Sequence, residues 1–105
     1  MKKLFLTISL SLIGFTAFAQ TAFEKAMTEK IAKVEDHKTP DEFTALANDF
    51  DRIGTKEAKE WLPYYYAAFA TIQKGRILMQ SGKTNELDPV AAEAEKYIAK
   101  AEALS

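Results

Sequence analysis

From residue 22 onward, apolar side chains recur every three or four positions, which is the spacing of an amphipathic α-helix. In the first such segment the apolar positions are Phe23, Met27, Ile31 and Val34. Charged and polar side chains occupy most of the positions between them. This pattern predicts a helix over residues 22–36 with one buried side.

A second helix has the clearest start signal in the chain. Thr39 is a favoured N-cap residue, Pro40 suits the first helical position, and Glu42 follows Thr39 by three residues. This spacing predicts a capping box, in which each of the two side chains bonds to the other residue's backbone N–H. The apolar stripe that follows is Phe43, Leu46, Ala47, Phe50 and Ile53. Gly54 is the expected C′ residue, because glycine adopts a left-handed backbone most easily.

The third predicted helix spans roughly residues 57–80 and contains Pro63 near its start. Proline clashes with a preceding helical turn, so two interpretations are open. Either a turn precedes a helix that starts near Leu62, or the helix starts near Lys59 with Pro63 in its first turn. We favour the second, because first-turn amides have no intrahelical partner in any case. Gly82 is the expected terminator.

Apolar residues are spread broadly around this third helix. Its main stripe is expected to be Leu62, Tyr65, Phe69, Ile72 and Met79, widened by Tyr66, Ala70 and Ile77. A helix this apolar is expected at the centre of the fold, with partners on two sides.

The fourth helix is expected to begin at Asp88, an N-cap residue followed by Pro89 at the first helical position. Its apolar stripe is Leu87, Val90, Ala94, Tyr97, Ala101 and Leu104. Because the link between the first two helices has only about five residues, these two should pack as an antiparallel hairpin. The sequence therefore predicts an all-α domain over residues 20–105, built of two consecutive antiparallel helical hairpins.

Residues 1–19 have the three-part organisation of a secretory signal peptide. Two lysines come first, an apolar run of about fifteen residues follows, and a small-x-small site closes it at residues 17–19. The run is shorter than the roughly 20 residues of a membrane-spanning helix. We expect cleavage between Ala19 and Gln20 and export of the remaining chain, to the periplasm or out of the cell.

Composition narrows the classes of partner. Twelve basic residues remain against fifteen acidic ones once the signal peptide is removed, and the two signs are interleaved. This weak negative balance indicates neither nucleic acid nor an anionic membrane as the target. The chain has no cysteine, so the domain is expected to fold without disulfides and to carry no lipid-modified cysteine. We expect no stable membrane insertion after cleavage.

The segment from Trp61 to Phe69 resembles the first helix of a tetratricopeptide-like unit in small exported bacterial proteins. In that repeat an aromatic residue and a leucine open the first helix, and small residues allow close helix approach. Trp61 and Leu62, then Ala67 or Ala68, match those roles approximately. The second helix of such a unit is similar to the run with Ala94, Ile98 and Ala101.

This resemblance has departures and clear implications. The link over residues 80–88 is longer than the tight turn of a standard repeat, and it breaks the strict 34-residue period. The resemblance implies a helical-repeat scaffold without catalytic residues. Because such arrays normally contain three or more repeats, it also suggests a truncated relative or a fragment of a longer array.

Candidate catalytic and metal-binding residues are few. His37 lies beside Glu35 and Asp36, but a single histidine without cysteine makes a poor metal site, and a histidine at a helix end more often meets the helix dipole. Asp49, Asp51 and Asp88 lack the loop pattern that calcium requires. No glycine-rich phosphate loop or activated nucleophile is recognisable. We expect no enzyme activity, no cofactor and no metal.

An aromatic cluster is the one feature that indicates a binding role. Trp61, Tyr64, Tyr65 and Tyr66 lie within six residues and point in different directions around a helix. Tyr65 is expected in the core and Tyr64 at the surface, although all four can also be packing residues. The candidate partner contacts are Trp61, Tyr64, Tyr66, Arg52 and Lys59, since aromatic and basic side chains often anchor interfaces.

These observations favour an exported, non-enzymatic helical-repeat module that binds a protein or peptide in the bacterial envelope. Two alternatives stay open. One is a structural or assembly protein that self-associates through unsatisfied end surfaces, and the other is a small-molecule binder that uses a cleft near Trp61.

Overall fold

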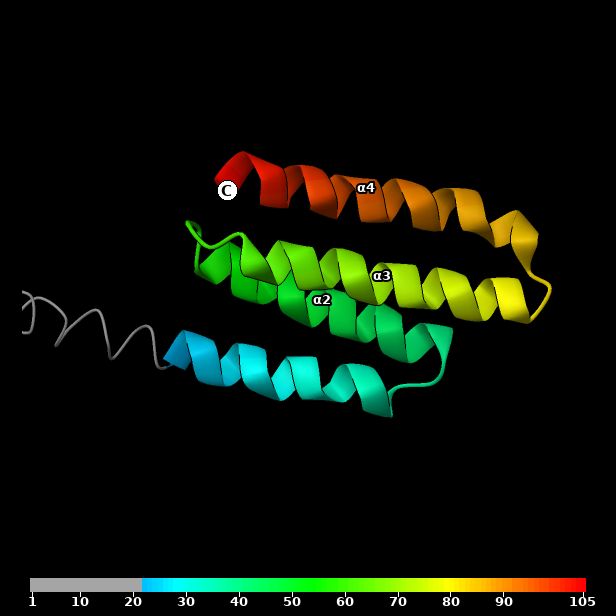
Figure 1. The fold of residues 1–105 in the computed structure, drawn as a ribbon, viewed down its shortest axis with the longest axis horizontal. Coiled ribbons are helices and arrows are strands. Elements are labelled where there is room, and N and C mark those ends of the chain that lie inside the picture. The colour runs from blue at the N-terminus through cyan, green and yellow to red at the C-terminus, as the bar shows by residue number, and fades with distance from the viewer. Residues whose placement is uncertain (1–21) are drawn as a thin grey trace, which may run out of the picture.

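The computed structural model describes residues 22–105, which form four helices (Figure 1). The first helix covers residues 22–36, α2 covers Pro40–Lys56, α3 covers Leu62–Gln80 and α4 covers Leu87–Leu104. A short 3₁₀ turn, η1, spans Thr84–Glu86. The all-helical prediction is confirmed for these residues, whereas the predicted signal peptide and its cleavage site at Ala19 and Gln20 lie outside them.

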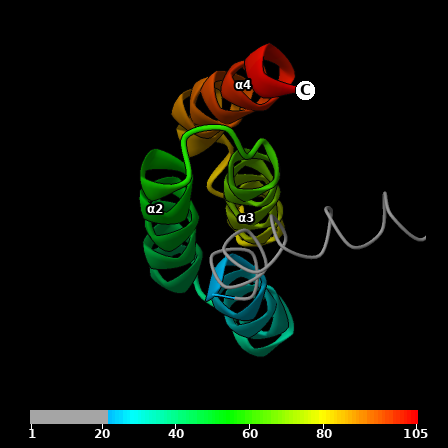
Figure 2. The same cartoon turned by 90° about the vertical axis from the view of Figure 1, so that its left-hand side faces the viewer.

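Successive helices run antiparallel and make two hairpins in series (Figure 1). In the end-on view, α2 and α3 lie beside each other, with the first helix on one side and α4 on the other (Figure 2). The central helix α3 packs against both α2 and α4. None of the helices in residues 22–105 is long and apolar enough to span a membrane.

One core cluster draws buried side chains from all four helices. The first helix contributes Phe23 and Met27, and α4 contributes Tyr97. The remaining members come from α2 and α3, and they are Phe43, Leu46, Ala47, Phe50, Ala67, Ala68 and Ala70. Large side chains of α2 therefore meet alanines of α3, which lets these two helices approach closely.

The start of α2 has the predicted capping box. Thr39 Oγ1 accepts a hydrogen bond from the N–H of Glu42 at 3.2 Å, and Glu42 Oε1 accepts one from the N–H of Thr39 at 3.1 Å. Pro40 occupies the first turn, where a missing N–H leaves no bond unmade. The stripe from Phe43 to Phe50 is buried as expected.

The end of α2 differs from the sequence prediction. Gly54 was expected at C′, but it is buried inside the last turn of a helix that continues to Lys56. A Cβ atom placed on Gly54 would lie 2.7 Å from Cζ of Tyr64 in α3. Glycine here leaves room for the close approach of an aromatic ring, and its backbone is not left-handed.

The start of α3 follows the interpretation that we disfavoured. The helix begins at Leu62 after a turn over residues 57–61, and Pro63 lies in its first turn. Its end is as predicted, because Gly82 has a φ of +78° and Lys83 N–H donates to the carbonyl of Leu78 at 2.8 Å. This 6→1 bond identifies a Schellman motif.

The fourth helix starts slightly earlier than expected. It begins at Leu87, directly after η1, and Glu86 takes the cap position without a side-chain hydrogen bond. Asp88 is therefore a first-turn residue and not the N-cap, although its charge there still suits the helix dipole. The predicted stripe is confirmed at its buried positions, which are Val90, Ala94, Tyr97 and Ala101.

We predict that Thr39→Ala lowers the free energy of unfolding by about 0.5–2 kcal/mol, because the N–H of Glu42 loses its acceptor. The matched control is Thr55→Ala in the same helix, where the hydroxyl only donates to the carbonyl of Asp51. The control should change stability by less than about 0.5 kcal/mol. Chemical denaturation of the three proteins measures both effects, and equal stability of both variants would contradict the capping role.

Candidate functional site

Besides Leu104 at the end of α4, five large apolar side chains of α3, its N-cap residue Trp61 and α4 are exposed to solvent. The exposed fractions are 42% for Trp61, 49% for Tyr65, 46% for Ile72, 55% for Met79 and 39% for Ile98. On α3 these positions are separated by four, seven and seven residues, so they fall on one side of the helix. We call this surface, defined by Trp61, Tyr65, Ile72, Met79 and Ile98, the α3–α4 face.

The face corrects the sequence prediction for α3. Tyr65, Ile72 and Met79 were expected in the main buried stripe, yet each is exposed. The buried residues of the helix are instead mostly small, and they are Pro63, Ala67, Ala68, Ala70, Thr71 and Leu78. Small side chains on this side of α3 permit close approach of α2 and α4. Because this side is buried, the larger residues on the opposite side must point to solvent.

The face is hollowed near the start of α3. A pocket of about 390 Å³ lies between α3 and α4 at this point. Its lining residues are Trp61, Tyr65, Ile98, Ala101, Glu102 and Ser105. The rings of Trp61 and Tyr65 meet edge to face with centroids 6.1 Å apart, which forms an aromatic wall. The pocket is mainly apolar, with one carboxylate at its margin.

The five candidate contact residues of the sequence analysis do not lie together. Trp61 belongs to the α3–α4 face, and Lys59 is exposed in the preceding turn. Tyr66 stacks on Phe50 of α2 with ring centroids 5.6 Å apart, so it packs against the first hairpin. Arg52 is on α2, where its guanidinium pairs with Asp49 at 3.3 Å.

Tyr64 is half-buried against the neighbouring helices. Its ring covers Gly54, and Nζ of Lys100 lies 5.3 Å from the ring centre. Tyr64 and Tyr65 therefore exchange the roles that we expected, since Tyr64 packs and Tyr65 is exposed. The sequence did contain a signal for this arrangement, because the alanines at positions 67, 68 and 70 mark the closely packed side of α3.

A second, smaller pocket of about 240 Å³ lies where α2, α3 and α4 meet. Polar side chains from all three helices line it, among them Asn48, Lys74 and Glu93. The buried ring of Tyr97 forms part of the same wall. Burial, followed by the negative charge of Asp51, raises the pKa of Tyr97 to about 12.

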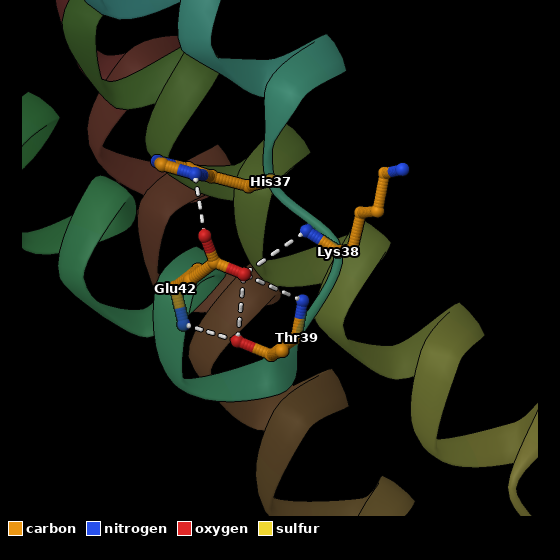
Figure 3. Close-up of polar contacts among 4 residues, drawn as sticks. All are labelled: His37, Lys38, Thr39 and Glu42. Atoms are coloured by element: carbon orange, nitrogen blue, oxygen red, sulfur yellow. Dashed lines mark hydrogen bonds and ion pairs between the residues drawn. The ribbon is translucent and has the colours of Figure 1, made fainter.

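His37 supports the start of α2 (Figure 3). Its Nδ1 lies 3.1 Å from Oε2 of Glu42, while Oε1 of Glu42 accepts from the N–H of Lys38 at 3.2 Å. The backbone bond from Lys38 and the side-chain bond from Thr39 hold the pKa of Glu42 below its usual value. Across residues 22–105, no group of three His, Cys, Asp or Glu side chains is placed to hold a metal ion.

We predict stability losses of different size at two adjacent tyrosines. Tyr64→Ala should lower the free energy of unfolding by about 2 kcal/mol or more, because it removes a ring that packs on Gly54. Tyr65→Ala should lower it by less than about 1 kcal/mol, because half of that side chain is already in solvent. Each variant is the other's control in chemical denaturation. The reverse order would place Tyr65 in the core and contradict the observed packing.

We also predict that Tyr97 limits stability in alkali. Because the folded pKa of about 12 exceeds the ordinary value of 10.0, the contribution of neutral Tyr97 is complete below pH 10. It should disappear as the pH rises from 10 to 12. Denaturation between pH 8 and pH 12 should show this loss in the unmodified protein and a smaller loss in Tyr97→Phe. Identical pH profiles would show that ionisation of Tyr97 is not coupled to folding.

Comparison with protein-family models, with curated proteins and with solved structures finds no match for this chain.

Proposed function

We propose that the chain is an exported, non-catalytic module that binds another polypeptide through the α3–α4 face. The observation that carries this proposal is the exposure of Trp61, Tyr65, Ile72, Met79 and Ile98 on one side of two neighbouring helices. Contiguous apolar side chains on a small domain are costly in water and mark a surface that becomes covered. The pocket beside Trp61 gives that surface a shape that a protruding apolar side chain can fill.

The residue types of the face also fit a protein interface. Tryptophan, tyrosine and methionine are enriched at the centres of interfaces, where large side chains bury area at a low cost in entropy. Among the residues that line the pocket, Glu102 adds a charge at the edge. An apolar centre with a polar margin is the usual composition of such a surface.

The proposed scaffold is a short helical repeat of the tetratricopeptide-like kind. Two observations support it: the hairpins follow one another in series, and small residues of α3 lie at the helix contacts. In a stacked array each hairpin covers a face of its neighbour, so a terminal hairpin leaves one face open. The α3–α4 face has the apolar character of a face that a neighbouring hairpin covers in such an array.

A small-molecule binder is the second candidate function. The pocket of about 390 Å³ beside Trp61 falls within the size range of ligand sites, and its lining is mainly apolar. A ligand there would change the fluorescence of Trp61, the single tryptophan of the chain.

The test places a photo-crosslinking amino acid, benzoylphenylalanine, at position 65 of the full chain in the cells that produce it. The control carries the same group at position 29, which is exposed on the first helix. We expect an adduct with a polypeptide at position 65 and none at position 29, with mass spectrometry identifying the partner. Absence of an adduct at position 65, or equal adducts at both positions, would contradict the proposed docking surface.

A further inference from the structure

The smaller pocket lies on the other side of α3 from the α3–α4 face. Its volume is about 240 Å³, and residues of α2, α3 and α4 line it. One of them is Lys74, two residues after Ile72 in α3. Two residues of an α-helix turn through roughly 200°, so Lys74 is nearly opposite Ile72. What binds in this pocket is therefore a separate question from what covers the α3–α4 face.

One cation and one anion line the pocket, and they come from different helices. Lys74 is half-buried on α3, and Glu93 belongs to α4. Burial, followed by the negative charges of Asp51 and Glu93, raises the pKa of Tyr97, so the carboxylate of Glu93 lies near this buried hydroxyl. Within residues 22–105 neither Lys74 nor Glu93 belongs to an ion pair. The pocket thus separates two opposite charges that have no ionic partner there.

Other charges close to the pocket do not line it. Asp51 and Lys100 are 3.8 Å apart and form a pair of their own between α2 and α4. The rest are exposed, so water and salt screen them, and they carry both signs: Asp41, Glu86, Asp88 and Lys96. The two charges that a bound molecule meets inside the pocket are therefore those of Lys74 and Glu93.

The remaining lining suits a small molecule that has an apolar part. Ala47, Pro89 and Val90 contribute hydrocarbon surface. The hydroxyls of Thr44 and Thr71 donate to carbonyls of their own helices, so their remaining lone pairs can only accept hydrogen bonds. The pocket is smaller than the roughly 300–1,000 Å³ of sites for drug-sized ligands. Its size and lining favour a compact ligand with donor groups.

We propose that this pocket binds a free α-amino acid with an aliphatic side chain. The carboxylate of the ligand pairs with Lys74, its ammonium group pairs with Glu93, and its side chain lies against Val90. A ligand with a single charge leaves the other protein charge covered and without a partner, which is costly, whereas a zwitterion provides both pairs. An internal polypeptide segment has neither charge at its backbone, so this ligand differs from the partner proposed for the α3–α4 face.

A titration with three molecules that share one hydrocarbon group tests the choice of ligand. L-valine has both charges, isobutylamine has only the ammonium group, and isovalerate has only the carboxylate. Each is added to the purified, ¹⁵N-labelled protein while amide chemical shifts are recorded by NMR. We expect saturable shifts around Asn48, Lys74 and Glu93 with valine, and dissociation constants about tenfold or more higher for the other two molecules, because each lacks one ion pair.

Charge-removing variants test the residues. Lys74→Met and Glu93→Gln should each raise the dissociation constant of valine by about tenfold or more, whereas Lys74→Arg keeps the charge and should retain binding. The matched controls remove the same charges from exposed positions of the first helix. They are Lys25→Met and Glu29→Gln, which should leave binding unchanged. Circular dichroism melts establish that each variant is folded.

The titration of the unmodified protein decides the matter even if a variant fails to fold. Absence of saturable shifts with valine overturns the proposal. It is also overturned if isobutylamine or isovalerate binds as tightly as valine, because the pocket then selects a single charge. Valine shifts centred on Trp61 would assign the binding to the other pocket and contradict the proposal as well.

Discussion

The close approach of α3 to its neighbours determines most of the remaining structure. Ala67, Ala68 and Ala70 are almost completely buried, and they face large side chains such as Phe50 of α2. This contact brings the two hairpins together and sets the rotation of α3 about its own axis. Once that rotation is set, every other side chain of α3 has a fixed direction. The same packing explains Gly54, since a side chain at this position would displace the ring of Tyr64.

This rotation also explains why the apolar surface and the core belong to the same helix. The third helix has more large apolar residues than its neighbours in residues 22–105 can cover. Tyr66 is placed against Phe50 and Tyr64 against Gly54, whereas Tyr65, between them in sequence, points to solvent. Two of the exposed aromatic residues, Trp61 and Tyr65, line one pocket together with Ile98 of α4. This exposure is the observation that supports the proposed binding role.

Polar contacts have a different function in this fold. The bonds among His37, Thr39 and Glu42 define where α2 begins and so fix the turn of the first hairpin. The pair of Lys30 and Asp49 at 3.0 Å links the first helix to α2. Lys100 stands 3.8 Å from Asp51 and thereby connects α4 to α2 at the surface. These interactions specify the arrangement of helices, while apolar burial supplies most of the stability.

The sequence by itself determined the helices of this protein and most of their ends. Local signals suffice for this purpose, because capping at Thr39 and the left-handed backbone at Gly82 depend on residues a few positions away. The stripes of the first helix, α2 and α4 were equally readable, since each of these helices has one apolar side.

Only the tertiary structure decided which side of α3 is buried. Its apolar residues surround the helix, so their periodicity did not identify a single buried side. The sequence prediction followed residue size and placed Tyr65, Ile72 and Met79 in the core. The outcome depends on how closely α2 and α4 can approach α3. The small residues are buried because the close packing that they allow gains more contact between helices than is lost when the large side chains stay exposed. The candidate site was predicted only at Trp61 for the same reason: its other members are residues of α3 and α4 that close packing left exposed.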